Sequence, residues 1–427
     1  MKQIVKTVLA SGVAAAFALP LAAHATNGYF APGYGAAAIG MGGVGVAYAQ
    51  DTLSAAANPA GIADVGMRAD LGFGFFNPER SAATGTPAGG RNGFGFNGQA
   101  SSSNRYYLIP GMGYTMPWDD QLTFGVAVIG NGGMNTTYKP NFYKSGAGSS
   151  KTLGINLVQV LMPITAAYKV DEHNVFGASV VLGAQAFSAR GLQAFGLFGI
   201  SSDPAHLTNN GTDYAQGAGV RLGWRGKFMD DNLTLGATYA SKVYMSRFSK
   251  YSGLFAGGGN FDVPANYALG IALKTTPKTT VAFDVQRIMY SGVPSVANRG
   301  PDANLVVTPE NQLGQDNGLG FGWKNQTVYK LGVNYKYNEF WDLRAGFNYG
   351  KTPISNDQLA FNVLAPATVE KHYTIGFTYS PNKSSAITMA YLRAANNVQQ
   401  ECGLAIVNCA RIQMYQNDVE LAYSWKF

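Results

Sequence analysis

Residues 419–427, VELAYSWKF, alternate between two kinds of side chain. The odd positions are aliphatic or aromatic, and the even positions are charged, hydroxylated or small. Because successive side chains of a strand point to opposite faces, the stretch predicts a strand with one apolar and one polar face. Such a strand, ending on the aromatic Phe427, is typical of the closing strand of an outer-membrane β-barrel, with lipid on one side and a lumen on the other.

The amino terminus predicts export. Lys2 and Lys6 precede an apolar stretch, residues 8–22, and Ala23-His24-Ala25 has the form of a signal-peptidase site. We therefore assign residues 1–25 to a signal peptide cleaved after Ala25. The rest of the chain has no apolar run long enough for a membrane helix. The expected location is the outer membrane of a Gram-negative bacterium.

Composition agrees with a barrel. Charged residues make up 13% of the 427 residues and aromatic residues 12%, with 54 glycines. The mean hydropathy is −0.03, a value that a membrane protein can have when apolar and polar residues alternate along strands. A secreted β-sandwich or β-helix is the alternative. The net charge falls from +7 to +5 without Lys2 and Lys6, which is too weak to indicate nucleic-acid binding.

Fourteen strand-like runs follow the first 65 residues. Short polar turns alternate with long loops between them, which is typical of a barrel whose two chain ends lie in the periplasm. The sequence therefore predicts an all-β fold, a 14-stranded antiparallel transmembrane β-barrel over residues 66–427. The runs are 66–78, 103–117, 121–133, 158–170, 173–190, 212–228, 232–247, 261–275, 278–290, 323–336, 341–351, 368–380, 384–395 and 413–427.

Residues 26–65 differ from the runs that follow. They are rich in Gly and Ala and alternate little, and Asp51 opens a short helix that Asn58-Pro59 ends. Compact small-residue material of this kind suits the inside of a lumen. Near the other terminus, Cys402 and Cys409 are the only cysteines, and in an oxidising compartment we expect a disulfide that closes the loop before the last strand.

These features together resemble the FadL/TodX family, outer-membrane transporters of long-chain fatty acids and aromatic hydrocarbons. The most specific piece is Ile39-Gly40 followed by small residues, Asp51 and Asn58-Pro59-Ala60. The resemblance implies a hatch in residues 26–65 that includes Asp51, Asn58, Pro59 and Ala60. It also implies capture of an apolar ligand by external loops, an inner pocket, hatch movement, and passive lateral release at an inward kink of the third strand.

The resemblance also assigns residues to these roles. Gly130-Asn131-Gly132-Gly133 falls late in the third predicted strand, where glycines permit a kink; an ordinary exit from strand to loop is the alternative. Arg190 and Lys324 match two basic residues that reach the inner pocket, where either can pair with a carboxylate. Bonds to loop carbonyls or to a barrel carboxylate are the alternative for both.

Two long loops carry dense apolar residues, which usually mark a binding surface; packing of the loops on themselves is the alternative. The predicted substrate contacts are Phe195, Leu197, Phe198, Leu254 and Phe255. The expected partners are a hydrophobic small molecule, outer-membrane lipid, lipopolysaccharide and, through Phe427, the barrel-assembly machinery. We expect a monomer.

The sequence leaves the substrate open. Residues 40–46 are almost wholly small and apolar, which suits an uncharged hydrocarbon as well as an acid. A non-selective porin or a structural or adhesin barrel is the alternative function, although a plug would abolish bulk conductance. We expect no enzyme, cofactor or metal site; a phospholipase needs a paired Ser and His on the wall, and only His372 is placed for it.

Overall fold

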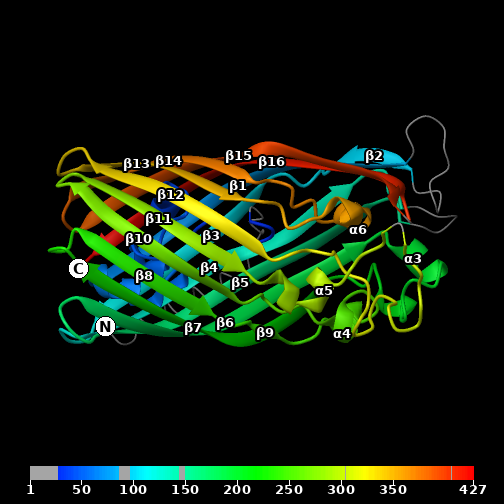
Figure 1. Ribbon diagram of the computed structural model, residues 1–427, viewed down its shortest axis with the longest axis horizontal. Helices are drawn as coiled ribbons and strands as arrows, with labels where there is room; N and C mark the ends of the chain where they lie inside the picture. The colour runs from blue at the N-terminus through cyan, green and yellow to red at the C-terminus, as the bar shows by residue number, and fades with distance from the viewer. Residues whose placement is uncertain (1–26, 86–96, 144–149, 303, 405) are drawn as a thin grey trace.

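The computed structural model describes residues 27–85, 97–143, 150–302, 304–404 and 406–427. The predicted signal peptide lies outside the described residues. The short turns and the carboxy terminus lie at one end of the molecule, and the long loops lie at the other (Figure 1).

The described chain forms one closed antiparallel barrel (Figure 1). Two short pieces, β2 (Gly98–Ser101) and β9 (Tyr244–Met245), join the sheet beside fourteen wall strands. The barrel closes where β1 pairs with β16, from Arg68 opposite Lys426 onward. The wall strands are β1 (Arg68–Gly85), β3 (Tyr107–Pro117), β4 (Leu122–Tyr138), β5 (Leu153–Lys169), β6 (Asn174–Arg190), β7 (Asp213–Phe228), β8 (Leu233–Ala240), β10 (Asn266–Thr276), β11 (Thr279–Ile288), β12 (Gln326–Lys336), β13 (Trp341–Gly350), β14 (Lys371–Asn382), β15 (Ser385–Leu404) and β16 (Asn408–Lys426).

The alternation of β16 matches the sequence prediction. Tyr423 and Trp425 are 38% and 41% exposed on the outer face, whereas Ser424 between them is 1% exposed and faces the lumen. The predicted fold, a 14-stranded antiparallel barrel, is confirmed. None of the described helices is both long and apolar enough to cross a membrane.

The predicted loop over residues 396–412 is wrong. β15 continues to Leu404 and β16 begins at Asn408, so Cys402 and Cys409 lie opposite each other in a long hairpin, joined by a disulfide. The outer ends of β1, β4 and β5 also run past the predicted limits. Strands that extend beyond the lipid need no apolar outer face, so the alternation that marks a membrane strand disappears there.

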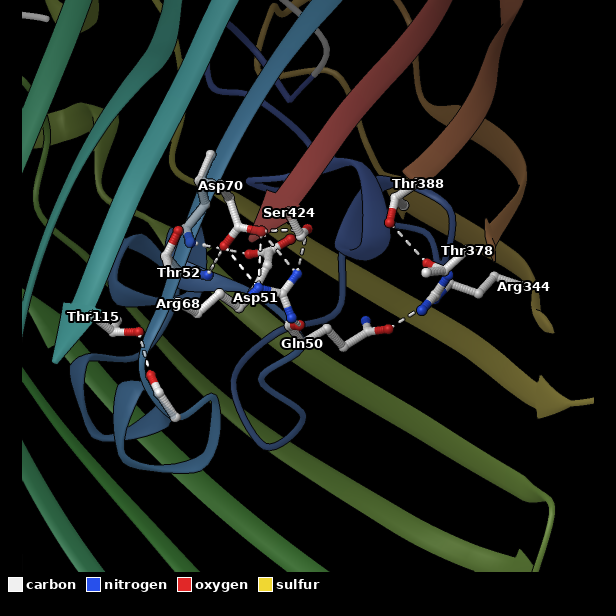
Figure 2. A network of polar contacts seen from close by, with 12 residues as sticks. Gln50, Asp51, Thr52, Arg68, Asp70, Thr115, Arg344, Thr378, Thr388 and Ser424 are labelled. Carbon is white, nitrogen blue, oxygen red and sulfur yellow. Dashed lines mark hydrogen bonds and ion pairs between the residues drawn. The ribbon is translucent and has the colours of Figure 1, made fainter. Parts of the chain in front are cut away.

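Short helices occupy the amino-terminal segment, defined here as residues 27–65, and the long loops. The amino-terminal segment lies inside the barrel against the lumen-facing residues of the wall (Figures 1 and 2). It contains α2 (Ala36–Ile39), η1 (Thr52–Ala56) and η2 (Pro59–Asp64). The loops contain α3 (Gln193–Leu197), η3 (Pro204–His206), η4 (Ser249–Tyr251), α4 (Ala256–Gly259), η5 (Tyr290–Gly292), α5 (Pro294–Ala297), η6 (Asn356–Gln358) and α6 (Leu359–Asn362).

Candidate functional site: a gap in the wall beside the amino-terminal segment

β4 is irregular where the sequence places four small residues. Its pairing with β5 shifts register between Gly130 and Gly132, which leaves Asn131 as the extra residue of a bulge. Gly132 has φ 154°, a conformation that favours glycine. Because β4 continues to Tyr138, these residues lie within the strand and not at its exit to a loop.

The bulge coincides with a break in the wall. β3 pairs with β4 only between Met112 opposite Val128 and Pro117 opposite Thr123. Within the described chain, residues 107–111 pair with β1 and have no ladder partner in β4. The two sides meet again where the Ser103 amide donates to the Thr137 carbonyl at 2.8 Å. We call the interval between residues 104–111 and residues 129–136 the wall gap.

The amino-terminal segment takes the edge of β4 that β3 leaves. Phe30 forms an antiparallel bridge with Gly132. The Ala31 amide donates to the Asn131 carbonyl at 2.9 Å, and the Gly133 amide donates to the Tyr29 carbonyl at 3.1 Å. Three residues of the amino-terminal segment therefore replace β3 as the neighbour of β4.

A side-chain bond fixes the same junction, because the Tyr34 hydroxyl donates to Asn131 Oδ1 at 2.7 Å. Ile109 and Ile129, 5% and 3% exposed, fill the wall gap from its two sides. Between them and the amino-terminal segment lies a small cavity, lined by apolar groups toward the gap and by charged groups toward the periplasmic end. Its lining includes Tyr34, Leu53, Ile109, Pro110, Ile129, Asp51, Arg68, Asp70 and Glu420.

A polar network anchors the amino-terminal segment below this cavity (Figure 2). Arg68 pairs with Asp70 at 2.8 Å and donates to the Gln50 carbonyl at 2.9 Å. Asp70 also accepts from the Thr52 amide at 2.9 Å and from the Ser424 hydroxyl at 2.6 Å. Strand β1 therefore holds the amino-terminal segment, and Ser424 of β16 supports the Asp70 carboxylate that accepts from it.

The predicted hatch residues lie within this anchored segment. Asp51 caps η1 by accepting from the Leu53 amide at 3.0 Å. Asn58 caps η2, which begins with Pro59 and Ala60, and donates to the carbonyls of Val46 at 2.7 Å and Trp224 at 2.9 Å. Asn58 is fully buried, so it joins two parts of the segment and the wall strand β7.

An aromatic cluster surrounds the start of the amino-terminal segment. Tyr29 packs against Tyr290, Trp323 and Phe261 with ring centroids 5.3, 5.7 and 6.0 Å away. Tyr290 donates to the Asn27 carbonyl at 2.6 Å. Burial raises the pKa of the Tyr290 hydroxyl, so it remains a neutral donor. The long loops thus hold the segment from the outer side.

The predicted loop contacts divide into two groups. Phe195 and Phe255 are buried, and with Leu254 they line a small apolar space that also touches Leu313 and Phe361. Leu197 and Phe198, 72% and 41% exposed, lie at the end of α3 and away from that space. The first group faces the interior of the loop cap, and the second faces solvent.

The structure places the two predicted carboxylate-binding residues at the outer end of the barrel. Arg190 is exposed at the outer end of β6, where its position follows the outward-facing residues of the strand. Lys324 is exposed in the loop before β12. Successive residues of a strand face opposite sides. In this part of β6 Ala189 faces the lumen, so Arg190 faces outward. The predicted place of Arg190 in the inner pocket is therefore wrong, and the pocket role of Lys324 stays a prediction.

Sequence reasoning missed Arg80, a buried arginine of β1 at the upper end of the wall gap. The predicted first strand ends at residue 78, so Arg80 was assigned to a loop; the continued alternation from Phe76 was the signal that places it inward. His372 faces the lumen, and in the described chain no serine hydroxyl is bonded to it. The described residues contain no group of His, Cys, Asp and Glu that could hold a metal ion.

The chain matches the family model described as outer membrane protein transport protein (OMPP1/FadL/TodX) over residues 8–402. The chain belongs to the OMPP1/FadL/TodX family. The resemblance seen in the sequence and the outer-membrane location are therefore confirmed. Together with the transmembrane barrel, membership of the OMPP1/FadL/TodX family identifies an outer-membrane channel for hydrophobic substrates.

Individual members of the family are distant. A long-chain fatty acid transport protein of Escherichia coli O6:H1 is 20% identical over 321 residues, 65% of this chain and 67% of the relative. The Pseudomonas putida toluene transporter TodX superposes with a TM-score of 0.70 at 22% identity, over 93% of this chain and 99% of TodX. A Pseudomonas aeruginosa FadL homologue gives 0.68 at 17%, over 94% and 100%. At these identities the structural likeness establishes the fold.

Proposed function

We propose that this protein takes up hydrophobic small molecules passively and releases them sideways into the membrane through the wall gap. The amino-terminal segment acts as the hatch that closes the gap. The observation that carries the proposal is the bridge between Phe30 and Gly132, with its two flanking backbone hydrogen bonds. A wall strand that pairs with the plug in place of its neighbouring strand can open without breaking the β4–β5 ladder.

The route begins at the long loops. Phe195, Leu254 and Phe255 supply apolar surface in the loop cap, and the aromatic cluster around Tyr29 continues it toward the hatch. The cavity behind Ile109 and Ile129 then leads to the gap. Sideways release keeps the solute out of periplasmic water, where each exposed CH₂ costs about 0.8 kcal/mol.

Hatch movement at the gap is energetically modest. Two backbone bonds and the bond from Tyr34 to Asn131 join the hatch to β4. A typical hydrogen bond contributes about 0.5–1.5 kcal/mol net, so their sum is a few kcal/mol. The burial of Tyr29 and Phe30 adds to this cost, so a ligand opens the gap by binding the open state preferentially.

Other parts of the proposal concern the surroundings. The exposed aromatic Phe427 at the periplasmic end serves as the recognition point for the barrel-assembly machinery, and the exposed Leu197 and Phe198 face the lipopolysaccharide layer. The protein acts as a monomer. A non-selective porin is disfavoured because the hatch and the loop cap fill the described lumen from both ends.

A reversible disulfide across the gap tests the proposal. A Cβ added at Gly130 would lie 2.6 Å from Ile109 Cγ2, which puts the two β-carbons within disulfide range. Oxidised Ile109→Cys/Gly130→Cys protein should lose uptake of toluene and decanoate, and reductant should restore it. The two single variants and the wild-type protein, each with and without reductant, control for Cys402–Cys409. Undiminished uptake by the oxidised double variant would reject lateral release.

A further inference from the structure

Four neighbouring strands of the wall, β14, β15, β16 and β1, change from apolar to polar at one level of their outer face (Figure 1). The outward apolar run that starts near the periplasmic end stops, in that order of strands, at Tyr373, Tyr391, Val419 and Phe75. The next outward residues are Lys371, Arg393, Asn417 and Asn77. Because Arg393 lies opposite Asn417, and Asn417 opposite Asn77, the change marks the outer edge of the lipid-facing band.

Arg393 lies at this edge in a fixed setting. Its guanidinium stacks over the Tyr415 ring, 4.5 Å from the centroid, and Nη1 donates to Asn417 Oδ1 at 2.8 Å. The Tyr391 hydroxyl donates to the same oxygen at 2.8 Å. A guanidinium has five N–H donors, and in the described chain Nη1 is the nitrogen of Arg393 that donates. The remaining donors therefore face the level at which lipid headgroups begin.

Two lysines extend the positive charge onto the neighbouring strands. Lys371 lies diagonally from Arg393, because Tyr373 is the residue opposite Arg393. Lys351, the residue after the end of β13, lies diagonally from Lys371, which is opposite Tyr349. Both lysines are exposed, and diagonal neighbours of a sheet are within reach of long side chains. We call Lys351, Lys371 and Arg393 the rim patch.

The acidic residues near the rim patch have other partners. Glu79, outward on β1, pairs with Arg105 at 3.4 Å. Glu370, just before β14, accepts from the Thr352 amide at 3.0 Å. Among the residues that the structure describes, the rim patch has no carboxylate within ion-pair distance. Its three positive charges therefore favour an anion at the depth of the headgroups.

We propose that the rim patch binds a phosphate of lipopolysaccharide, with Arg393 as its main contact. The planar fork of arginine matches the geometry of phosphate oxygens, and a lysine adds a compact charge. The apolar band directly below offers Ile375, Ile387 and Met389 to the acyl chains of the same molecule. The rim patch lies toward the long loops, so it faces the outer leaflet. The inference depends on the outer-membrane location and is independent of lateral release.

The test uses the full-length barrel refolded in detergent without lipopolysaccharide, and native mass spectrometry measures binding of three probes. The probes are bisphosphorylated lipid A, chemically dephosphorylated lipid A and phosphatidylglycerol. Arg393→Gln should weaken binding of bisphosphorylated lipid A by about tenfold or more, because a hydrogen bond to a charged group is lost. Binding of dephosphorylated lipid A should stay unchanged.

Two further variants calibrate this result. Lys371→Gln should weaken binding of bisphosphorylated lipid A by about two- to fivefold, as expected for an exposed charge. Lys278→Gln is the matched control, because Lys278 is an exposed lysine at the periplasmic end, and its affinity should equal that of the wild-type protein.

Four outcomes would overturn the inference. The first is equal wild-type affinity for the two forms of lipid A, and the second is an equal loss in Arg393→Gln and Lys278→Gln. The third is phosphatidylglycerol binding as tightly as lipid A with the same dependence on Arg393, which would make the rim patch a phospholipid site. If Arg393→Gln loses heat-modifiable migration in gels, Lys371→Gln decides, and unchanged lipid A affinity there is the fourth. Substrate uptake is not measured, so the proposed function is tested separately.

Discussion

The two edges of β4 differ in how completely they pair with the neighbouring strand. Toward β5, pairing runs from Leu122 to Tyr138 with a single bulge. Toward β3, it stops at Val128, and the hatch takes the remaining edge. The same strand thus has one edge paired with a wall strand along its length and one edge shared between β3 and the amino-terminal segment. A closed sheet needs every backbone group paired, and the amino-terminal segment meets part of this need at residues 131–133 of β4.

The variant with the largest expected effect disrupts the pairing between β4 and β5. A Cβ at Gly154 of β5 would lie 2.0 Å from the Thr136 carbonyl oxygen, and backbone cannot move aside as a side chain can. Gly154→Val should therefore abolish barrel assembly, seen as loss of heat-modifiable migration in gels. Gly130→Ala meets a side-chain methyl of Ile109, Cγ2, and no backbone atom, and should still assemble. Normal assembly of Gly154→Val would show that the two edges of β4 do not differ in rigidity.

The next variant blocks the edge of β4 that pairs with the amino-terminal segment. Valines at Gly132 and Gly133 place branched side chains where the hatch meets β4, and Gly132 has a φ that favours glycine. The double variant should insert normally and lose most substrate uptake. Uptake at the wild-type rate would remove the bulge from the route.

A smaller effect loosens the hatch within the lumen. Asn58→Ala removes the hydrogen bonds to the carbonyls of Val46 and Trp224, and the buried Val46 carbonyl left without its donor costs about 1–3 kcal/mol. The barrel should still insert, while planar bilayers should show more frequent ion-conducting events and cells should show impaired uptake. Wild-type conductance and uptake would exclude Asn58 from a role in hatch docking.

The smallest effect removes one bond of the junction. Tyr34→Phe loses the hydrogen bond to Asn131, worth about 1 kcal/mol, so amide exchange at Ala31 and Gly133 should quicken roughly fivefold. Tyr391→Phe is the matched control, because its hydroxyl bonds Asn417 on the outer face of the barrel. Equal changes in the two variants would mean that the junction has no special lability.

The sequence predicts the structure correctly where apolar and polar residues alternate regularly along a strand or where a cap depends on neighbouring residues. The lipid-facing rows of β16, β12 and β14 show it in full, and the caps at Asp51 and Asn58 depend on local residues alone. It failed where the outcome depends on distant partners. The hairpin that contains Cys402 and Cys409 lacks an apolar face, so no alternation marks it. The orientation of Arg190 depends on which residues of β6 face the lumen. The contacts of Arg80 are carbonyls of Asn104 and Asn135, which no spacing in the chain reveals.

A lock between hatch and wall tests the central claim most directly. Phe30 and Gly132 are opposite residues of the closely spaced, non-hydrogen-bonded kind, whose Cα atoms lie about 4.5 Å apart, a separation that a disulfide spans. Uptake by Phe30→Cys/Gly132→Cys cells should be lost when the pair is oxidised and return on reduction, with both single variants active throughout. Full uptake with the lock closed would show that substrates pass without moving the hatch from β4.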